Sequence, residues 1–364
     1  MRNLLVAFCS LSGLVWADPL VVHEWGTFTS LQDENGRCLG GINVDDEPVP
    51  EFVHDLGNLI VDATPQALPS KGLQPHLASV TLRLETPVLY FHLPASQKSA
   101  QVDVEVGFQG GWLSQFYPDA KAEAPGVENS RKQGPSATTL GRLQWLGLQV
   151  GGYHSGPPSQ STVWKAPRQA KSSPVTTAKG EKEQFLFYRG VGHVDSPIRV
   201  KSQFAAGYIK ANSEAGAIAR AWLVQVGSNG SLAFVNQGPF EKTAKIALPT
   251  AKGKLSDLRA SMKAALIQDG LYGDEAQAML DAWQESYFKA PGLRLFYIVP
   301  KPWTDQVLPL TVRSPLEVKT QRVMIGRVEL VTPKQRRDLQ ACRQGEGAAY
   351  QRLGRFRQAL LRLP

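Results

Sequence analysis

Apolar and polar residues alternate between residues 20 and 240, or form short β-branched and aromatic runs bounded by Gly, Pro, Asn and Asp. Alternation is typical of strands, because successive side chains of a strand point to opposite faces of a sheet. The predicted strands are 20–31, 78–93, 100–108, 139–150, 184–191, 197–209, 220–227 and 231–236. Between the last two, Asn229-Gly230 predicts a hairpin with a tight primed turn. So many short strands predict an antiparallel, sandwich-like region.

The segments 119–138 and 154–182 interrupt this pattern. Both are rich in Pro, Ser, Lys, Gly and Ala and have few apolar residues. They offer too little apolar surface to offset the entropy of ordering a compact element, so we predict long surface loops.

Helical spacing begins after residue 249. Apolar stripes predict helices at 255–267 and 274–288, the second with Asp274 as its N-cap. Strands are predicted again at 293–299, 307–312 and 322–331.

A C-terminal helix is predicted from Thr332-Pro333, where a capping hydroxyl precedes a proline at the first helical position. Its apolar face is formed by Tyr350, Leu353, Phe356, Leu360 and Leu363. The predicted fold class is therefore mainly β, with an antiparallel sandwich-like region over 18–240 and an α+β region over 241–364. The second region either forms its own domain or adds its strands to the same sheets.

The first 17 residues have the layout of a secretory signal peptide: Arg2, an apolar core over 4–16 and the small residue Ala17. This core is shorter than the roughly 20 residues of a transmembrane helix, and no later run is longer. We therefore predict a soluble mature chain without a transmembrane segment, located in the periplasm or outside the cell after cleavage near Ala17.

The formal net charge of +8 comes mostly from the C-terminus. Residues 333–364 hold eight basic side chains against two acidic ones, whereas the rest of the chain is nearly neutral. The basic helix either docks on the sheet by its apolar face or lies on an anionic membrane or envelope polymer. Nucleic acid is not an expected partner outside the cytoplasm.

Two cysteines remain after the signal segment, Cys38 and Cys342. An oxidising compartment permits them to form a disulfide between the first loop and the last helix. Two separate thiols are the alternative, and the spacing does not decide between them.

Five short segments stand out: 23–29 (HEWGTFT), 84–91 (LETPVLYF), 187–192 (FYRGVG), 303–305 (WTD) and 322–327 (RVMIGR). Together they resemble a family of exported bacterial proteins, and the likeness extends over essentially the whole mature chain. The resemblance implies export and a shared fold. It implies no catalytic residue.

Metal binding is one chemistry that the histidines allow. His23, His54 and His92 are the candidate ligands, since a transition metal takes three or four ligands from His and carboxylates. Adjacent strand residues point to opposite faces, so Glu24 is not expected to hold the same ion as His23. No His-x-His or His-x-x-x-His spacing occurs, and scattered structural histidines are the alternative.

Glu85 and Glu329 are the candidate catalytic carboxylates. Each shares a strand face with an arginine two positions earlier, Arg83 and Arg327. The arginine either poises a buried carboxylate for acid/base chemistry or forms part of a charged ladder on a solvated sheet face.

Aromatic residues near loops offer a third possible chemistry. Trp25, Trp112 and Tyr117 are candidate binding residues, because exposed rings stack on sugars or on protein partners. Packing in the core is the alternative.

No nucleophile elbow, phosphate loop or dinucleotide motif occurs, and no motif requires a cofactor, although the histidines are compatible with a transition metal. Two function classes follow. The first is a non-catalytic exported or envelope-associated binding protein, with an envelope polymer or a protein as its partner. The second is a metal- or carboxylate-dependent enzyme of the hydrolase class that uses the His23 region and Glu85.

Overall fold

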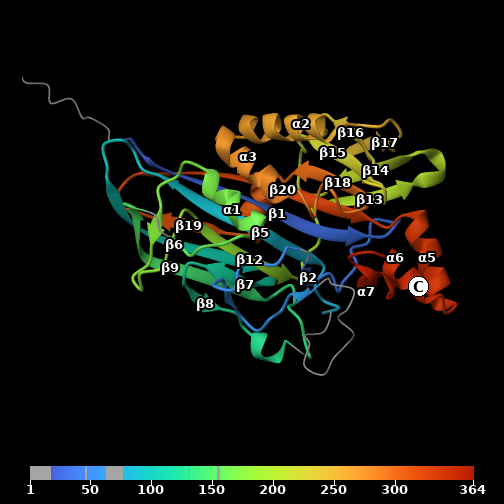
Figure 1. Ribbon diagram of the computed structural model, residues 1–364, viewed down its shortest axis with the longest axis horizontal. Coiled ribbons are helices and arrows are strands. Elements are labelled where there is room, and N and C mark those ends of the chain that lie inside the picture. Colours follow the sequence, from blue (N-terminus) through green and yellow to red (C-terminus); the bar gives the residue numbers. More distant parts are fainter. Residues whose placement is uncertain (1–17, 46, 63–76, 131, 154–155) are drawn as a thin grey trace, which may run out of the picture.

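A computed structural model describes residues 18–45, 47–62, 77–130, 132–153 and 156–364. The predicted signal peptide, residues 1–17, lies outside the described residues. The fold is mainly β, as predicted, with one large mixed sheet and a smaller number of helices, most of them toward the C-terminus (Figure 1).

The large sheet takes strands from both predicted regions. Its hydrogen-bonded order is β11 (Lys182–Glu183), β10 (Val175–Thr176), β9 (Leu140–Gly151), β7 (Gly111–Tyr117), β12 (Leu186–Gly192), β5 (Leu82–His92), β1 (Leu20–Gln32), β20 (Val318–Leu330), β18 (Gly292–Ile298), β15 (Ala221–Val226) and β16 (Leu232–Gln237). Four more strands join off this path: β3 (His54–Asp55), β6 (Ser99–Gln109), β8 (Lys121–Glu123) and β19 (Leu310–Arg313). At its centre β1 pairs with β5 antiparallel and with β20 in parallel. The beginning and the end of the chain are therefore paired in the middle of one sheet.

Two smaller sheets accompany it. One contains β13 (Ile198–Gln203), β14 (Tyr208–Ser213) and β17 (Thr243–Ala247), and the other contains β2 (Val44–Asp45) and β4 (Val61–Asp62). The single strand predicted over 197–209 is wrong, because Gly207 adopts a φ of 75° and turns the chain between β13 and β14. The hairpin of β15 and β16 is confirmed, but its turn is not primed: Gly230 has a φ of 77°, whereas Asn229 does not adopt a positive φ.

Seven α-helices lie in the described part of the chain: α1 (Thr162–Lys165), α2 (Leu255–Gln268), α3 (Gly273–Ala282), α4 (Lys301–Val307), α5 (Pro333–Arg343), α6 (Gly347–Arg352) and α7 (Arg357–Leu360).

Thr332 caps α5 as predicted, since its side chain accepts from the amide of Gln335. Tyr272, rather than Asp274, is the N-cap of α3. The C-terminal stripe forms two short helices, because Gly354 has a φ of 78° between them. None of these helices has both the length and the apolar character needed to cross a bilayer.

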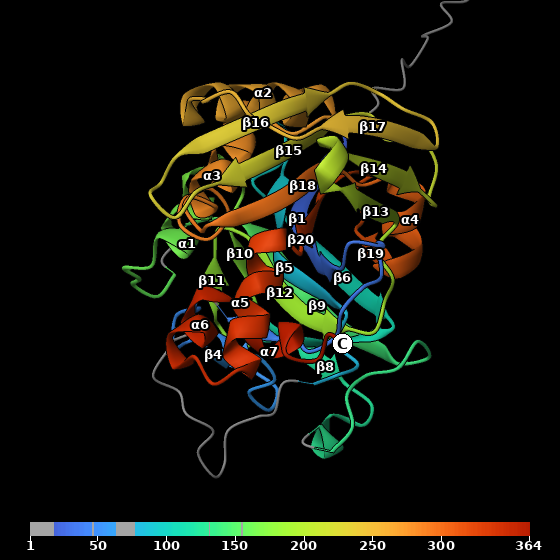
Figure 2. The same cartoon turned by 90° about the vertical axis from the view of Figure 1, so that its right-hand side faces the viewer.

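Three hydrophobic cores divide the interior. The first fills the curled main sheet, the second lies between that sheet and helices α2 and α3, and the third lies under α5, α6 and α7 (Figure 2). Leu353, Phe356, Leu360 and Leu363 are buried in the third core, so the C-terminal segment docks by its apolar side. The predicted loops at 119–138 and 154–182 hold short elements, and Trp164 anchors the second of them in a core.

Candidate metal centre

The candidate site lies where α3 packs on the sheet beside β1 and β5. Strand β1 sends alternate side chains to the two faces of the sheet, so His23 and Trp25 face α3 while Glu24 points to the other side. His23 pairs with Tyr90, which is two positions before His92 on β5. The sheet therefore presents two imidazoles, on one face, to the first turn of α3.

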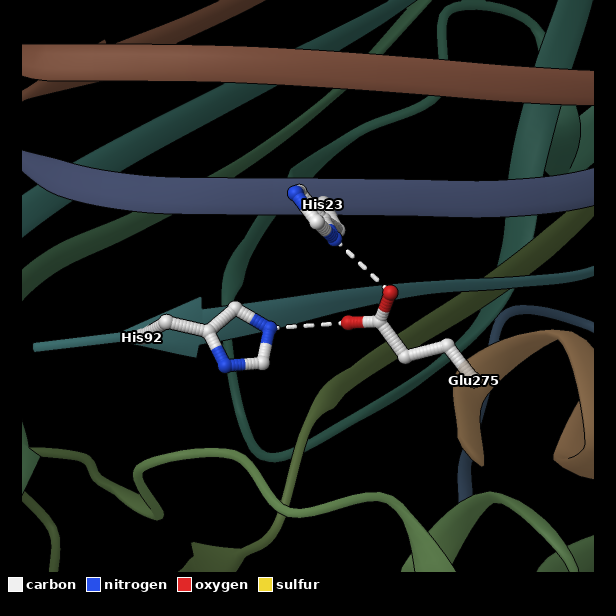
Figure 3. A group of neighbouring side chains, drawn as sticks. All are labelled: His23, His92 and Glu275. Carbon is white, nitrogen blue, oxygen red and sulfur yellow. Dashed lines mark hydrogen bonds and ion pairs between the residues drawn. The ribbon is translucent and has the colours of Figure 1, made fainter. Parts of the chain in front are cut away.

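Glu275, in that first turn, binds both imidazoles with one carboxylate. His23 Nδ1 lies 2.7 Å from its Oε2, and His92 Nε2 lies 2.8 Å from its Oε1. The backbone amide of Tyr272 also donates to Oε2, at 2.8 Å. The carboxylate is fully buried, and the His23 and His92 side chains are 4% and 14% exposed. Figure 3 shows the two imidazoles reaching the carboxylate from β1 and β5, with Glu275 projecting from the helix.

An aromatic side chain covers the site. The Tyr272 ring lies 4.5 Å from the His23 ring and 4.7 Å from the His92 ring, measured between centroids. Tyr272 itself is 46% exposed, so the two imidazoles lie just below the molecular surface. The site is buried on its sheet side and close to solvent on the side of Tyr272.

The two histidines stabilise the charged form of Glu275. Burial alone would raise the pKa of this carboxyl, but the hydrogen bonds from His23 and His92 outweigh it and lower the pKa to about 2. The carboxylate is therefore ionised over the whole physiological pH range and can serve as a metal ligand without losing a proton.

The donor set matches a divalent transition metal. One ligand atom from each of His23, His92 and Glu275 lies within 4.8 Å of the others. Tetrahedral zinc, with bonds of about 2.0–2.2 Å, places its ligand atoms about 3.4 Å apart, so shifts of roughly 1 Å would make room for an ion. His23 Nδ1 and His92 Nε2, which now donate to Glu275, would have to pass their protons to the other ring nitrogen or to solvent before they could bind it. Three protein ligands would leave a fourth position for water or another ligand.

The metal ligands predicted from sequence are only partly brought together. His23 and His92 share the site, but His54 does not belong to it: its Nε2 lies 3.1 Å from the Glu181 carboxylate and its ring stacks on Phe116. Glu24 is also excluded, as its strand position predicted.

Glu275 is the functional residue that sequence reasoning missed. It lies in the predicted helix 274–288, one helical turn before the buried Met279, and so falls on the buried face of that helix. An acidic residue on an apolar stripe was the available signal. This signal does not identify His23 and His92 as partners of Glu275, because they lie 252 and 183 residues away in the sequence.

Glu24 belongs to a second, separate cluster inside the curled sheet. Its carboxylate accepts from the hydroxyl of Tyr188 and, at 2.5 Å, from Arg322 Nε. Arg322 also bonds Asp305 at 3.0 Å. Burial and the Glu24 carboxylate raise the pKa of Tyr188 well above its usual value. This ion pair is buried at Glu24 and extends through Arg322 to the exposed Asp305, and we assign it to the fold.

Glu85 and Glu329 lie in a third cluster, on a sheet face that is buried. The solvated alternative is wrong, because the backbone at Val44 and Glu47 and the C-terminal segment at Arg355 cover this face. Glu85 lies 3.2 Å from Arg83 and 2.6 Å from Arg355, and the Tyr287 hydroxyl donates to it.

These arginines control the charge of both carboxyls. Burial on its own would raise the pKa of Glu85, but Arg355, Arg83 and Arg327 hold it well below its usual range. Glu329 is held low in the same way by Arg294 and Arg327, which lie 3.0 and 2.5 Å away. Glu85 is bonded on both oxygens, and its arginines and those of Glu329 keep both carboxyls ionised, so both are poor general acids. Through Arg355, Glu85 also binds the C-terminal segment to the sheet.

The aromatic candidates are core residues. Trp25, Trp112 and Tyr117 are at most 3% exposed, so their predicted role as binding residues is wrong and their packing alternative holds. Cys38 and Cys342 are both free thiols, which selects the separate-thiol alternative.

Comparison with known proteins adds little. No family model matches the chain, and no curated protein matches its sequence. Two solved structures of the yeast delta-COP-I mu-homology domain, one in complex with a Dsl1 WxWxV peptide, are similar to it at 7% and 9% identity. Each alignment covers 86% of this chain and 98% of that domain, with TM-scores of 0.27 and 0.25. Similarity this low carries no argument about fold or function.

Proposed function

We propose that this is an exported binding protein whose His23, His92 and Glu275 hold a divalent transition-metal ion of the zinc class. The observation that carries the proposal is the convergence of two imidazole nitrogens and an ionised carboxylate, within 4.8 Å, from three elements far apart in the sequence. The export part is supported by the signal-peptide layout of residues 1–17 and by the resemblance to exported bacterial proteins.

A purely structural role for the three residues is the competing explanation. Hydrogen bonds from imidazoles to Glu275 help to hold α3 on the sheet, and one imidazole would be enough for that purpose. Two nitrogens and one oxygen, with a solvent-facing side beside Tyr272, form the donor set of known His-His-carboxylate zinc centres. The second imidazole is the feature that favours a metal.

Metal titration of the mature chain, residues 18–364, tests the proposal. After removal of metal with EDTA and addition of zinc, we expect one Zn²⁺ per chain by mass-spectrometric metal analysis. Affinity should fall more than about 100-fold in His92→Gln and Glu275→Gln, because loss of even an outer-shell partner of a ligand costs about 10- to 100-fold. The chain provides a matched control in His54, whose Nε2 also faces a carboxylate, that of Glu181, at 3.1 Å.

The control makes the outcome decisive. His54→Gln should leave zinc binding unchanged, because His54 lies outside the ligand set. A wild-type protein that binds no stoichiometric zinc, or a His54→Gln variant that loses as much affinity as His92→Gln, would overturn the proposal.

The three-ligand set also favours a second candidate function, a metal-dependent hydrolase, because catalytic zinc sites keep one position open for water. Glu85 has no role in this second candidate function, because its carboxylate is already bonded to Arg83 and Arg355. Zinc-dependent hydrolysis of a nitrophenyl ester that disappears in His92→Gln would support it, and zinc binding without any hydrolysis would reject it.

A further inference from the structure

The exposed face of the small sheet β13–β14–β17 carries three lysines side by side. Lys201 on β13 pairs with Lys210 on β14, and Lys210 pairs with Lys245 on β17. Directly paired residues point to the same face, with their Cβ atoms about 5 Å apart. All three side chains are exposed, while Val200 and Ile209 on the other face are buried in a core. We call these three residues the lysine row; it spans about 10 Å across the strands.

The row has no acidic partner in the described part of the chain. None of its three ammonium groups forms an ion pair there, although the neighbouring Arg199 binds Glu214 at 2.7 Å and Asp195 at 3.1 Å. Like charges directly opposite each other destabilise a sheet. The row therefore costs stability that no acidic side chain of the described residues offsets.

Protection of sheet edges does not explain the row. Lysine on an outer strand blocks unwanted pairing with another chain, which accounts for Lys201 and Lys245. Lys210 lies on the central strand β14, which is hydrogen-bonded on both sides and has no edge to protect. Lys210 is repelled by the lysines on both sides of it, and an anion bound from outside the chain would relieve that repulsion.

The C-terminal helices, where the basic surplus of the sequence lies, are less suited to such an anion. Arg336, Arg352 and Arg355 are each engaged by a carboxylate of this chain, at 2.6 to 2.8 Å. Figures 1 and 2 both show β13, β14 and β17 on the side of the molecule away from α3, so the row is also separate from the candidate metal centre.

We propose that the lysine row binds a linear anionic polysaccharide that carries closely spaced carboxylate or sulfate groups. The row runs directly across three neighbouring strands, which suits one extended chain laid across them. Tyr208, half-buried, lies against Lys245 with the ammonium 4.1 Å from its ring centroid, and so adds an aromatic surface at one end.

A lipid bilayer fits this face less well. Membrane-binding surfaces combine basic side chains with large exposed apolar ones. The large exposed hydrophobic residues of the described chain are Leu146, Tyr153, Ile267 and Tyr272, and none of them lies on this sheet.

Binding of the mature chain to three probes tests the proposal: polygalacturonate, heparin and vesicles of anionic phospholipid. We expect the protein to bind at least one of the two polymers, with an affinity that falls steeply between about 20 and 150 mM salt, because exposed charge pairs are screened. Replacing the row by Lys201→Gln, Lys210→Gln and Lys245→Gln should weaken binding on the order of tenfold, since each exposed pair contributes about two- to fivefold.

A matched control removes the same charge elsewhere. Lys98, Lys132 and Lys319 are exposed and form no ion pair in the described chain, so their triple replacement by Gln should change polymer affinity less than twofold. Equal losses in the two triple variants, no polymer binding at low salt, or preferential binding to vesicles would each overturn the proposal.

A stability measurement completes the test and is independent of the ligand. Relief of like-charge repulsion should move the urea midpoint of Lys210→Gln above that of the wild type, while polymer affinity falls. A midpoint at or below that of the wild type would show that the row carries no strain of its own and would remove the argument for an external anion.

Discussion

Replacement of Glu275 by glutamine in the metal-free protein should change how stability depends on pH. Glutamine keeps the size of the side chain but cannot be ionised, so the charge-assisted bonds from His23 and His92 are lost. The wild-type carboxyl has a folded-state pKa of about 2, against an ordinary value of 4.5. A carboxyl whose pKa is lowered by folding stabilises the protein above its unfolded pKa, and that stabilisation is lost as pH falls toward the folded pKa.

The size of the effect follows from this difference. Folding lowers the pKa of Glu275 from 4.5 to about 2, and each pKa unit is worth about 1.36 kcal/mol. The ionised carboxylate therefore contributes about 3 kcal/mol to the free energy of unfolding at pH 7. At pH 3 the same two pKa values leave only about 1.4 kcal/mol, so about 2 kcal/mol disappears between pH 7 and pH 3. In Glu275→Gln this part of the pH dependence should be absent.

Urea unfolding in EDTA, followed by circular dichroism at pH 7, 5, 4 and 3, measures the difference. The other buried carboxylates, Glu85 and Glu329 among them, titrate in both proteins and cancel in the comparison. The gap in unfolding free energy between wild type and variant should narrow by about 2 kcal/mol from pH 7 to pH 3. A gap that stays constant would show that the imidazoles do not stabilise the Glu275 charge, and would refute the reasoning behind the site.

Three further predictions concern the fold, and urea unfolding at pH 7 measures each. Arg355→Met should cost about 1.5–3 kcal/mol, because the buried Glu85 carboxylate loses one charged hydrogen bond while it keeps Arg83 and Arg327; a change below 1 kcal/mol would contradict the assigned role of this pair. Gly326→Ala should cost about 1–3 kcal/mol, since the new Cβ would meet the Tyr297 ring, and Tyr297→Leu in the same chain should recover part of the loss. Thr332→Ala should cost about 1 kcal/mol through the lost N-cap, whereas Thr332→Ser should be nearly neutral.

The segment HEWGTFT shows how far a local pattern reaches. Strand alternation alone predicted that His23 and Glu24 point to opposite faces, and they do: His23 bonds Glu275 on the helix side, and Glu24 bonds Tyr188 inside the sheet. Gly26 is needed because an added Cβ would lie 2.9 Å from the Pro87 backbone, at the point where the register between β1 and β5 shifts.

The other segments that carry the family resemblance contribute to the same buried clusters. Tyr188, Asp305 and Arg322 come from three of them and meet at Glu24, while Glu85 and Arg327 meet in the arginine cluster. These segments therefore describe how the sheet is held together, and only His23 among them contributes to the candidate metal centre.

Prediction from sequence was incomplete at one point and wrong at another, because a local pattern does not contain the packing or the turn that decides the structure. Alternation states which residues share a face, but it does not state what covers that face. It therefore left a buried and a solvated face open for Glu85, and the C-terminal segment selects the buried one. The predicted strand 197–209 failed at Gly207 because one residue with a positive φ turns the chain while the residues around it keep strand-like composition.

By itself, the sequence determined the main strands, helix α2, the cap of α5 and the sharing of faces, because these depend on side-chain period and on backbone preferences over a few residues. It also placed α3, although that helix ends at Ala282 and not at 288 as predicted. Only the tertiary structure decided that β1 lies between β5 and β20. That placement brings His23 to Glu275, 252 residues away, and Glu24 to Tyr188 and Arg322, which are 164 and 298 residues away. Such pairing depends on how the whole chain buries its apolar surface, so a short stretch of sequence does not contain it.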